Sequence, residues 1–364
     1  MYGPAEIAKR YSDAGAGKTK LAIPKMFILA IFAGMFIAFG AFGSQVAGTD
    51  VTGGASAGRL MSAVVFPVGL LMVIMAGAEL FTGNNLIIIS VLNKKTTVRG
   101  LFKNWIIVYL GNFVGSILVA TTLTFSHAYS LYGGALAEAA VTTAQNKVLL
   151  TFPEALLKGI LCNILVCIAV WISFSAEDVA GKILGLYLPI MLFVTSGFEH
   201  SVANMYFIPA GLFVSGEYGI AATSLTWSGF LLNNLLPVTL GNMIGGVGIV
   251  GLGYFFVYLH NVKPVRTAHV SNPETKQTVD VTNYPDPARL DVVSENPVPL
   301  ARSLSFLTEI HKEDSHTIEV ALNDATIRIR NDADPALLSQ TVRVTKDTSQ
   351  QASTQPRLRS SLKL

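Results

Sequence analysis

Six long apolar segments dominate the first part of this 364-residue chain. They run, in order, over residues 26–47, 60–92, 104–126, 153–175, 183–214 and 228–260. Each is long enough to supply the ~20 residues that a helix needs to cross a bilayer. Charged residues make up only 13% of the chain, against about 25% in a soluble domain. The sequence therefore predicts an all-α, polytopic membrane protein with six transmembrane helices.

Basic residues gather on one side of the predicted membrane. Lysines and arginines precede the first segment and follow the second, fourth and sixth, whereas the opposite loops carry few charges besides Arg59 and Lys147. Because positively charged loops stay in the cytoplasm, we expect both termini to be cytoplasmic, in the plasma or inner membrane. The net charge of +3 thus concerns membrane orientation and not binding to nucleic acid.

Charge and polarity divide the chain into three regions. We expect a cytoplasmic N-terminal segment over residues 1–24, a six-helix membrane channel domain over 25–262, and a polar, largely disordered cytoplasmic tail over 263–364. Within the tail, residues 317–322 and 325–330 alternate as strands do and predict a hairpin, and Asp334-Pro335 predicts the start of a short helix. We expect no transport role for the tail, with a regulatory plug or a partner site as the alternative.

The second and fifth segments exceed the ~20 residues that a span requires, and each has a polar middle. The second contains Gly83-Asn84-Asn85, and the fifth contains the polar run from Glu199 to Asn204, followed by Pro209. Polar, helix-breaking residues at membrane depth are tolerated where the backbone lines a cavity. Helices 2 and 5 are therefore predicted to be broken, as in transporters whose broken helices meet near the midplane.

The two halves of the apolar region repeat one another. Gly77, Glu79 and Asn84 in the second segment match Gly197, Glu199 and Asn204 in the fifth. The third and sixth segments match independently, through Asn104, Leu110-Gly111-Asn112 and Gly115 against Asn234, Leu240-Gly241-Asn242 and Gly245. Because three helices in each half invert the second copy, this is an inverted 3+3 repeat, and such repeats build a pathway at their interface.

Four stretches of the chain resemble the signature stretches of the formate/nitrite transporter family. They are GAELFTGN (77–84), GILCN (159–163), GFEHSVANMYFIP (197–209) and NNLLPVTLGNMIGG (233–246), and the likeness runs from about residue 20 to 262. The resemblance implies a homopentamer of aquaporin-like protomers, each with its own pore. Glu79 departs from the aspartate that formate channels often have there.

The resemblance also implies roles for individual residues. It places His200 at the centre of the pore, Leu70, Leu80 and Phe81 at the inner constriction with Thr82 as a polar partner, and Phe66 and Phe193 at the outer constriction. It implies that Asn163 and Asn242 are polar pore positions and that Lys147 is a vestibule lysine.

The residues themselves support some of these roles. Ionisable residues inside a bilayer usually line a pathway, so we expect His200 to be functional. Lys147 is the lone Lys or Arg between the third and fourth segments, and a cation at a pore mouth concentrates anions. Glu199 either satisfies loop amides or takes part in proton movement, and Glu79 presents the same choice. The Gly-xxx-Gly pairs predict close helix packing.

Desolvation decides the form in which an acid would cross. Bringing a carboxylate into a low-dielectric constriction costs several kcal/mol, whereas protonating an acid of pKa about 4 at pH 7 costs about 4 kcal/mol. We therefore expect passive passage of the neutral acid: an anion is drawn in, acidified in the vestibule or at His200, and loses its proton beyond the apolar rings. Formate is the first choice of substrate, and nitrite, hydrosulfide, acetate and lactate remain open.

Other classes of protein fit the residues less well. A water or glycerol channel should carry two Asn-Pro-Ala motifs, which the sequence lacks. No nucleophile and base pair or metal cluster accompanies His200, so we expect no catalytic residues, metal or cofactor. Cys162 and Cys167 are interpreted as packing residues. A sodium-coupled carrier is the alternative from another class, because broken helices also suit carriers.

Overall fold

The computed structural model describes residues 1–260, 307–314, 317–322 and 325–330. The chain divides into two compact units, Met1–Val262 and Lys263–Leu364, and each is considered by itself. The assignment of residues 1–24, 25–262 and 263–364 to a cytoplasmic segment, a channel domain and a cytoplasmic tail stays a prediction.

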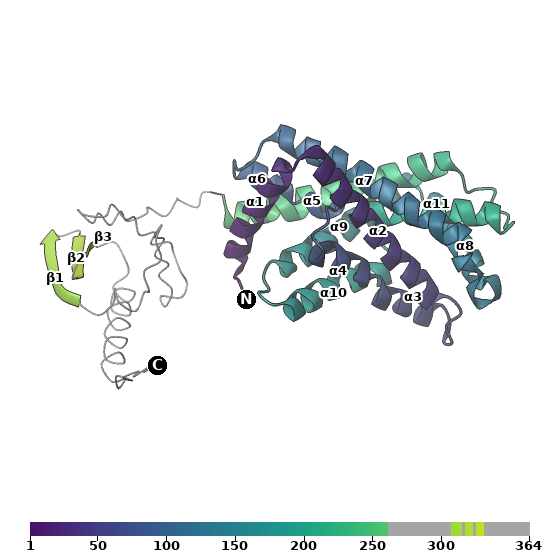
Figure 1. The fold of residues 1–364 in the computed structure, drawn as a ribbon, viewed down its shortest axis with the longest axis horizontal. Coiled ribbons are helices and arrows are strands. Elements are labelled where there is room, and N and C mark those ends of the chain that lie inside the picture. Colours follow the sequence, from purple (N-terminus) through teal and green to yellow (C-terminus); the bar gives the residue numbers. More distant parts are fainter. Residues whose placement is uncertain (261–306, 315–316, 323–324, 331–364) are drawn as a thin grey trace, which may run out of the picture. The chain divides into compact units, whose positions relative to one another are not determined.

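Every element described in the first unit is a helix (Figure 1). The first half contains α1 (Pro4–Lys20), α2 (Ile23–Gly48), α3 (Gly54–Val65), α4 (Pro67–Met75), α5 (Phe81–Asn84), α6 (Ile87–Leu92) and α7 (Val98–Phe125). After the connecting 3-10 helix η1 (Ala128–Gly134), the second half contains α8 (Ala135–Val148), α9 (Phe152–Ser173), α10 (Val179–Thr195), α11 (Ser201–Glu217), η2 (Gly229–Leu235), α12 (Leu236–Met243), η3 (Ile244–Gly251) and α13 (Leu252–Tyr258). The elements η2 and η3 are π-helical turns within the sixth span.

The second and fifth apolar segments are both broken, as the sequence predicts. Helix α4 ends at Met75 and α5 begins at Phe81, while α10 ends at Thr195 and α11 begins at Ser201. In both breaks a glycine with left-handed backbone follows the helix that ends there: φ is +74° at Gly77, after α4, and +69° at Gly197, after α10. Residues with a β-carbon disfavour this backbone region, so a glycine allows the chain to leave the helix there.

The breaks also affect how many helices are long enough to span a membrane. Within residues 1–260 five helical stretches are sufficiently long and apolar: Ile23–Gly48, Gly54–Met75, Val98–Phe125, Phe152–Ser173 and Gly229–Tyr258. The fifth predicted span is absent from this set because its first part, α10, and the half-helix that follows the break are each too short alone. A pair of half-helices still occupies its place in the fold.

Glycines bring the third and sixth spans against the first and fourth. A β-carbon at Gly115 of α7 would collide with the backbone carbonyl of Ile31 on α2, and one at Gly245 of η3 would collide with the carbonyl of Ile160 on α9. A β-carbon at Gly111 of α7 would likewise collide with α2, at the side chain of Ala30. The predicted close helix packing is therefore present in both halves of the repeat.

Helix α1 belongs to the first unit, although no helix is predicted there from the sequence. It buries Ile7, Ala8 and Tyr11 and contacts α6 (Figure 1). The hydroxyl of Tyr11 donates to the carbonyl of Gly83, in the half-helix after the first break, at 3.0 Å. The N-terminal segment thus packs against the broken second span.

The second unit contains a three-stranded antiparallel sheet in the order β1-β2-β3. Strands β2 (Thr317–Leu322) and β3 (Ala325–Arg330) occupy the two alternating segments of the sequence, with Thr317 opposite Arg330. Strand β1 (Leu307–Asp314), which the sequence did not predict, pairs with β2. The all-α description therefore applies to the membrane unit and not to the sheet. The short helix predicted from Asp334 lies outside the described residues.

Candidate functional site

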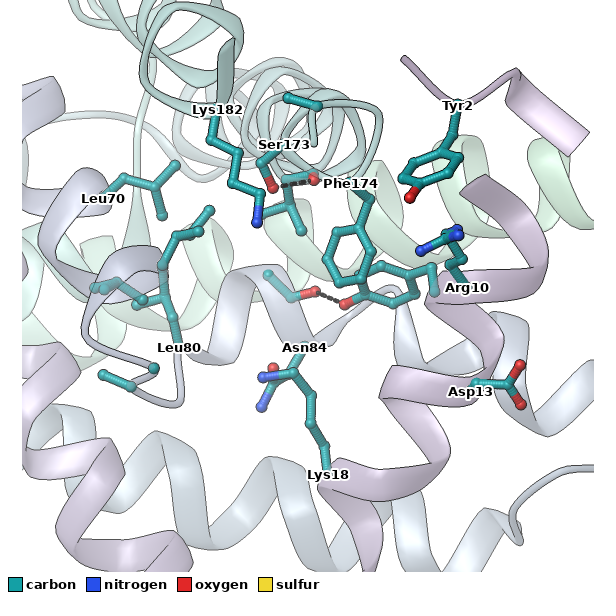
Figure 2. Close-up of a pocket in the computed structure, with 18 of the residues that line it drawn as sticks. Tyr2, Arg10, Asp13, Lys18, Leu70, Leu80, Asn84, Ser173, Phe174 and Lys182 are labelled. Carbon is teal, nitrogen blue, oxygen red and sulfur yellow. Dashed lines mark hydrogen bonds between the residues drawn. The ribbon is translucent and has the colours of Figure 1, made fainter. Parts of the chain in front are cut away.

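Two cavities of the first unit are lined by predicted site residues. One has a volume of about 690 Å³ and is lined by residues of α1, α4, the first break, and the facing ends of α9 and α10. Figure 2 shows Lys182 extending into this cavity, with Leu70 and Leu80 along one side and Tyr2 and Arg10 along the other. The second cavity has a volume of about 520 Å³ and is lined by residues that include Phe66, Lys147, Phe193, Glu199 and His200. We call these the Lys182 cavity and the His200 cavity.

Apolar side chains stand where the two cavities approach each other. Leu70 lines the Lys182 cavity and Phe66, one helical turn before it, lines the His200 cavity. The rings of Phe66 and Phe193 meet edge to face with centroids 5.5 Å apart, and the ring of Phe193 lies 6.0 Å from that of His200. An ion passing between the cavities would have to cross this apolar contact without its water.

Phe81 takes a different position from its predicted partners in the inner constriction. Its ring is buried and packs edge to face on Tyr109 at 4.9 Å, and it lines neither of the two cavities described above. Leu70 and Leu80, in contrast, both line the Lys182 cavity. All three residues belong to one buried cluster, and a role for Phe81 in the inner constriction stays a prediction.

His200 makes two hydrogen bonds that define its protonation state. Its Nδ1 atom accepts from the backbone N–H of Ala203 at 3.0 Å, which caps α11, and its Nε2 atom lies 2.8 Å from the hydroxyl oxygen of Thr82. A ring nitrogen that accepts a hydrogen bond carries no proton, so Nε2 holds the proton of a neutral imidazole and donates it to Thr82. The hydroxyl hydrogen of Thr82 is then free to be donated to a third group.

Glu199 stands at the centre of a buried network beside His200. Its carboxylate accepts two hydrogen bonds from the ammonium of Lys147, at 2.9 and 3.1 Å, and one from the side-chain amide of Asn204 at 2.6 Å. The Asn204 amide also donates to the Asn234 side chain, which in turn donates to the backbone carbonyl of Lys147. A buried carboxylate is stable only when paired in this way.

The first half of the repeat contains the same network around Glu79. The ammonium of Lys18 donates to Glu79 at 2.7 Å, and the amide of Asn84 donates to both Glu79 and Asn104, at 2.7 and 2.9 Å. Matched residues therefore make matched contacts: Glu79 with Glu199, Asn84 with Asn204, and Asn104 with Asn234. The central residue differs, because Leu80 stands in the first break where His200 stands in the second.

Asn242 and its repeat partner Asn112 hold the two breaks in place. The side-chain oxygen of Asn242 accepts from the backbone N–H of Ser201, and its amide donates to the carbonyls of Gly159 and Glu199. Asn112 does the same around Phe81 and Glu79. All three hydrogen bonds of Asn242 thus go to the backbone, which orients the loop that carries His200.

Asn163 lies next to Thr82. Its amide donates to the carbonyl of Asn242 at 2.7 Å and to that of Thr82 at 3.3 Å, whereas its side-chain oxygen is buried without a partner. The structure thus brings Asn163, Thr82 and His200 together. It also places Phe66, Phe193, Lys147 and Glu199 around one cavity with His200.

Lys18 is a site residue that sequence reasoning missed. It lies in a GAGKT stretch that superficially resembles a phosphate loop, although no strand precedes it. A signal was available: Lys18-Thr-Lys-Leu-Ala-Ile-Pro24 and Lys147-Val-Leu-Leu-Thr-Phe-Pro153 share the lysine, a leucine and the proline in register. The repeat therefore begins one helix earlier than the predicted 3+3 core, with α1 matched by α8.

The described residues contain no group of three or more His, Cys, Asp or Glu side chains that could hold a metal ion. Cys162 and Cys167 are both buried and unpaired with each other. The site offers hydrogen bonding by His200, Thr82 and the asparagines, and its buried charged groups are the two Lys–Glu pairs.

Comparison with known proteins places this arrangement among membrane channels. The model of the formate/nitrite transporter family matches residues 5–256. A probable formate transporter of Methanothermobacter thermautotrophicus is 40% identical over 70% of this chain and 97% of its own length. The formate channel FocA of Escherichia coli K12 is also 40% identical, over 70% of this chain and 94% of its own.

Two solved structures share the fold. A pentameric formate channel with formate bound matches with a TM-score of 0.59 and 36% identity, over 65% of this chain and 98% of that chain. An ion channel of the same family matches with a TM-score of 0.62 and 29% identity, over 69% of this chain and 98% of that one.

Proposed function

The chain belongs to the formate/nitrite transporter family, whose members are multi-pass membrane transporters and not enzymes, and on this premise we propose that it is a passive, proton-linked channel for small monovalent anions. Formate is the proposed substrate, because several of the similar proteins are named as formate channels or transporters. Nitrite is the second choice, since the family as a whole is named for both anions.

The hydrogen-bonded pair of His200 and Thr82, which lies beside the apolar contact of Phe66 and Phe193, carries this proposal. A neutral imidazole that donates to Thr82 leaves a hydroxyl hydrogen for the oxygen of a small acid. It supplies no positive charge to hold a bare anion. The site therefore suits a neutral acid better than an ion, in agreement with the cost of desolvating a carboxylate.

The same geometry supports a proton that comes from the vestibule and not from His200. His200 in this tautomer could release a proton only by becoming an imidazolate, and it could accept one only by breaking the Nδ1 bond that caps α11. The anion is therefore protonated in the vestibule before it reaches His200, and it crosses as the acid. The gradients of the anion and of the proton together determine the direction of flow.

The remaining site residues support the path. Asn242 orients the loop that carries His200, and Asn163 supplies a buried acceptor beside Thr82. Leu70 and Leu80 on one side and Phe66 and Phe193 on the other exclude water, so that only a neutral molecule crosses cheaply. The ammonium of Lys147 neutralises the buried carboxylate of Glu199, so the second break does not expose a bare negative charge to the path.

Assembly and location follow from the same premise. We propose a homopentamer in which each protomer has its own pore, because a solved relative is a pentameric formate channel. The proposed location is the plasma or inner membrane with both termini in the cytoplasm, on the distribution of lysine and arginine.

Purified protein in proteoliposomes provides the test. A formate gradient should acidify the lumen, as reported by an enclosed pH dye, and the rate should rise as external pH falls. Nitrite, hydrosulfide, acetate and lactate should be compared at equal concentration, and replacing sodium by potassium should change nothing. A formate current that crosses without protons, or flux that requires sodium, would refute the proposal.

A further inference from the structure

Lys147 does not present a free positive charge to the His200 cavity. Its ammonium lies 2.9 Å from Glu199, and the side chains of the two residues are only 15% and 7% exposed. An ion pair this tight acts outside the protein as a dipole, whose field decreases faster with distance than that of a single charge. The sequence predicts that Lys147 captures anions, but a neutralised lysine attracts them only weakly. Anion capture in this cavity therefore needs another positive charge.

Two other cations line the same cavity. Arg59 is exposed on α3, and Lys158 is half-buried on α9. Within the part of the chain that the structure describes, neither side chain makes an ion pair. Among the described residues that line this cavity, Glu199 is the one carboxylate, and Lys147 already neutralises it.

Both cations stand at the break that carries His200. A β-carbon built on Gly197 would lie 2.9 Å from a guanidinium nitrogen of Arg59, so this guanidinium covers the start of the break. The backbone carbonyl of Lys158 accepts from the N–H of Glu199, which fixes Lys158 beside the same loop. Two positive charges therefore flank the approach to His200, neither of them held in an ion pair, although Lys158 also interacts with the exposed carboxylate of Glu154 one helical turn earlier.

The Lys182 cavity differs in its charge. Lys18 is paired with Glu79, Arg10 with Glu6, and Asp13 with Lys95. Glu177 also lines this cavity and binds the N-terminal ammonium. Lys182 remains as one cation, in a cavity that contains two acidic side chains, so the positive potential is weaker than in the His200 cavity.

We propose that Arg59 and Lys158 form the capture site for small monovalent anions in the His200 cavity. This inference rests on the proposed transport function and assigns a step before the site of permeation. Two positive charges that line a hollow with low-dielectric walls, where the one lining carboxylate is already paired with Lys147, raise the local anion concentration. They thereby lower the anion concentration at which flux is half-maximal, without changing the barrier at the apolar contact.

The first experiment measures flux. The double variant Arg59→Gln/Lys158→Gln should need about three to ten times more formate for half-maximal flux at low ionic strength, with maximal flux preserved. Near 1 M salt, where the screening length is ~3 Å, wild type and variant should converge. Lys182→Gln is the matched control, since it removes a cation that also lines a cavity but from the opposite one.

The second experiment measures the potential in the cavity without relying on transport. Asn146 is exposed, lines the His200 cavity and has no hydrogen bond among the described contacts, so Asn146→Cys supplies a reporter thiol, while Cys162 and Cys167 are buried. Its rate of modification by an anionic methanethiosulfonate, relative to a cationic one, should fall about tenfold when Arg59 and Lys158 are both replaced by Gln. Lys182→Gln should leave this ratio unchanged.

The two readouts separate this inference from the proposed function. An unchanged reactivity ratio in the double variant overturns the capture site, whatever the wild type transports. A changed ratio with an unchanged half-saturating formate concentration also overturns it, because the charges would then not serve the permeating anion. Wild-type protein that moves no formate refutes the proposed function, even if the reactivity ratio responds as expected.

Discussion

At the scale of single residues, His200 has two tasks that a substitution can separate. Its Nδ1 atom caps α11 by accepting from Ala203, and its Nε2 atom donates to Thr82. Asparagine is a favourable N-cap residue and retains an amide donor, whereas phenylalanine offers neither. The choice of replacement therefore decides whether the helix, the permeation step or both are tested.

We predict that His200→Asn folds with nearly wild-type stability and conducts with an altered selectivity among small acids, because an amide donor replaces the imidazole, while the pH dependence set by protonation in the vestibule is retained. His200→Phe should lose about 1 kcal/mol through the missing cap, and its proton-coupled formate uptake should collapse. Thermal unfolding in detergent and luminal acidification in proteoliposomes measure the two effects. If His200→Phe transported formate with the wild-type rate and pH profile, the histidine would be a packing residue.

The buried Lys–Glu pairs give a second prediction at this scale. Lys147→Met leaves the carboxylate of Glu199 without its cation and should destabilise the protein by about 3–5 kcal/mol. The double variant Lys147→Met/Glu199→Gln should recover much of that loss, because it removes the uncompensated charge.

A double-mutant cycle of thermal stabilities measures this coupling, and Lys18→Met with Glu79→Gln provides the matched cycle in the first half of the repeat. Coupling is expected in both cycles. Strictly additive losses at Lys147 and Glu199 would show that the ion pair contributes nothing to the fold.

At the scale of elements, glycine determines how closely the spans approach and where they break. Gly77 and Gly197 hold the left-handed backbone that ends α4 and α10. In η3, Gly245 faces the carbonyl of Ile160, while Gly248 on the same element has nothing within 4 Å of the position that a β-carbon would occupy. One helix thus offers a crowded and an open glycine for comparison.

We predict that Gly245→Ala destabilises the protein by about 1–3 kcal/mol, because the added methyl forces η3 away from α9. Gly248→Ala should leave stability unchanged or slightly raise it. Thermal unfolding of both variants in the same detergent makes the comparison. Equal effects of the two substitutions would indicate that helix propensity, and not the close approach to α9, governs this span.

At the scale of the whole molecule, the tail lies outside the part of the sequence that matches the family. The family model ends at residue 256, and the relative from Methanothermobacter thermautotrophicus is matched over 97% of its length by only 70% of this chain. Everything that forms the two cavities and the paired networks precedes the second unit. The three-stranded sheet therefore has no evident part in permeation.

We predict that deleting residues 270–364 leaves assembly and maximal formate flux nearly unchanged, since all six spans and both breaks are retained. Size-exclusion chromatography with light scattering reports the oligomer, and proteoliposomes report the flux. A truncated protein that dissociates, or one whose flux changes several-fold, would assign the tail a structural or regulatory role.

The sequence alone determined the spans, the two breaks and the inverted repeat, because these depend on local composition. A bilayer admits only backbone that satisfies its own hydrogen bonds, so apolar length and misplaced polar residues are readable along the chain. The sequence also indicated His200 as a functional residue, because an ionisable side chain inside a membrane span is unusual. Only the tertiary structure decided that Lys147 is neutralised by Glu199, that Lys18 is its counterpart, and that Arg59 and Lys158 line the His200 cavity without an ion pair. Those outcomes depend on which side chains from distant helices meet, and a one-dimensional pattern does not contain those distances.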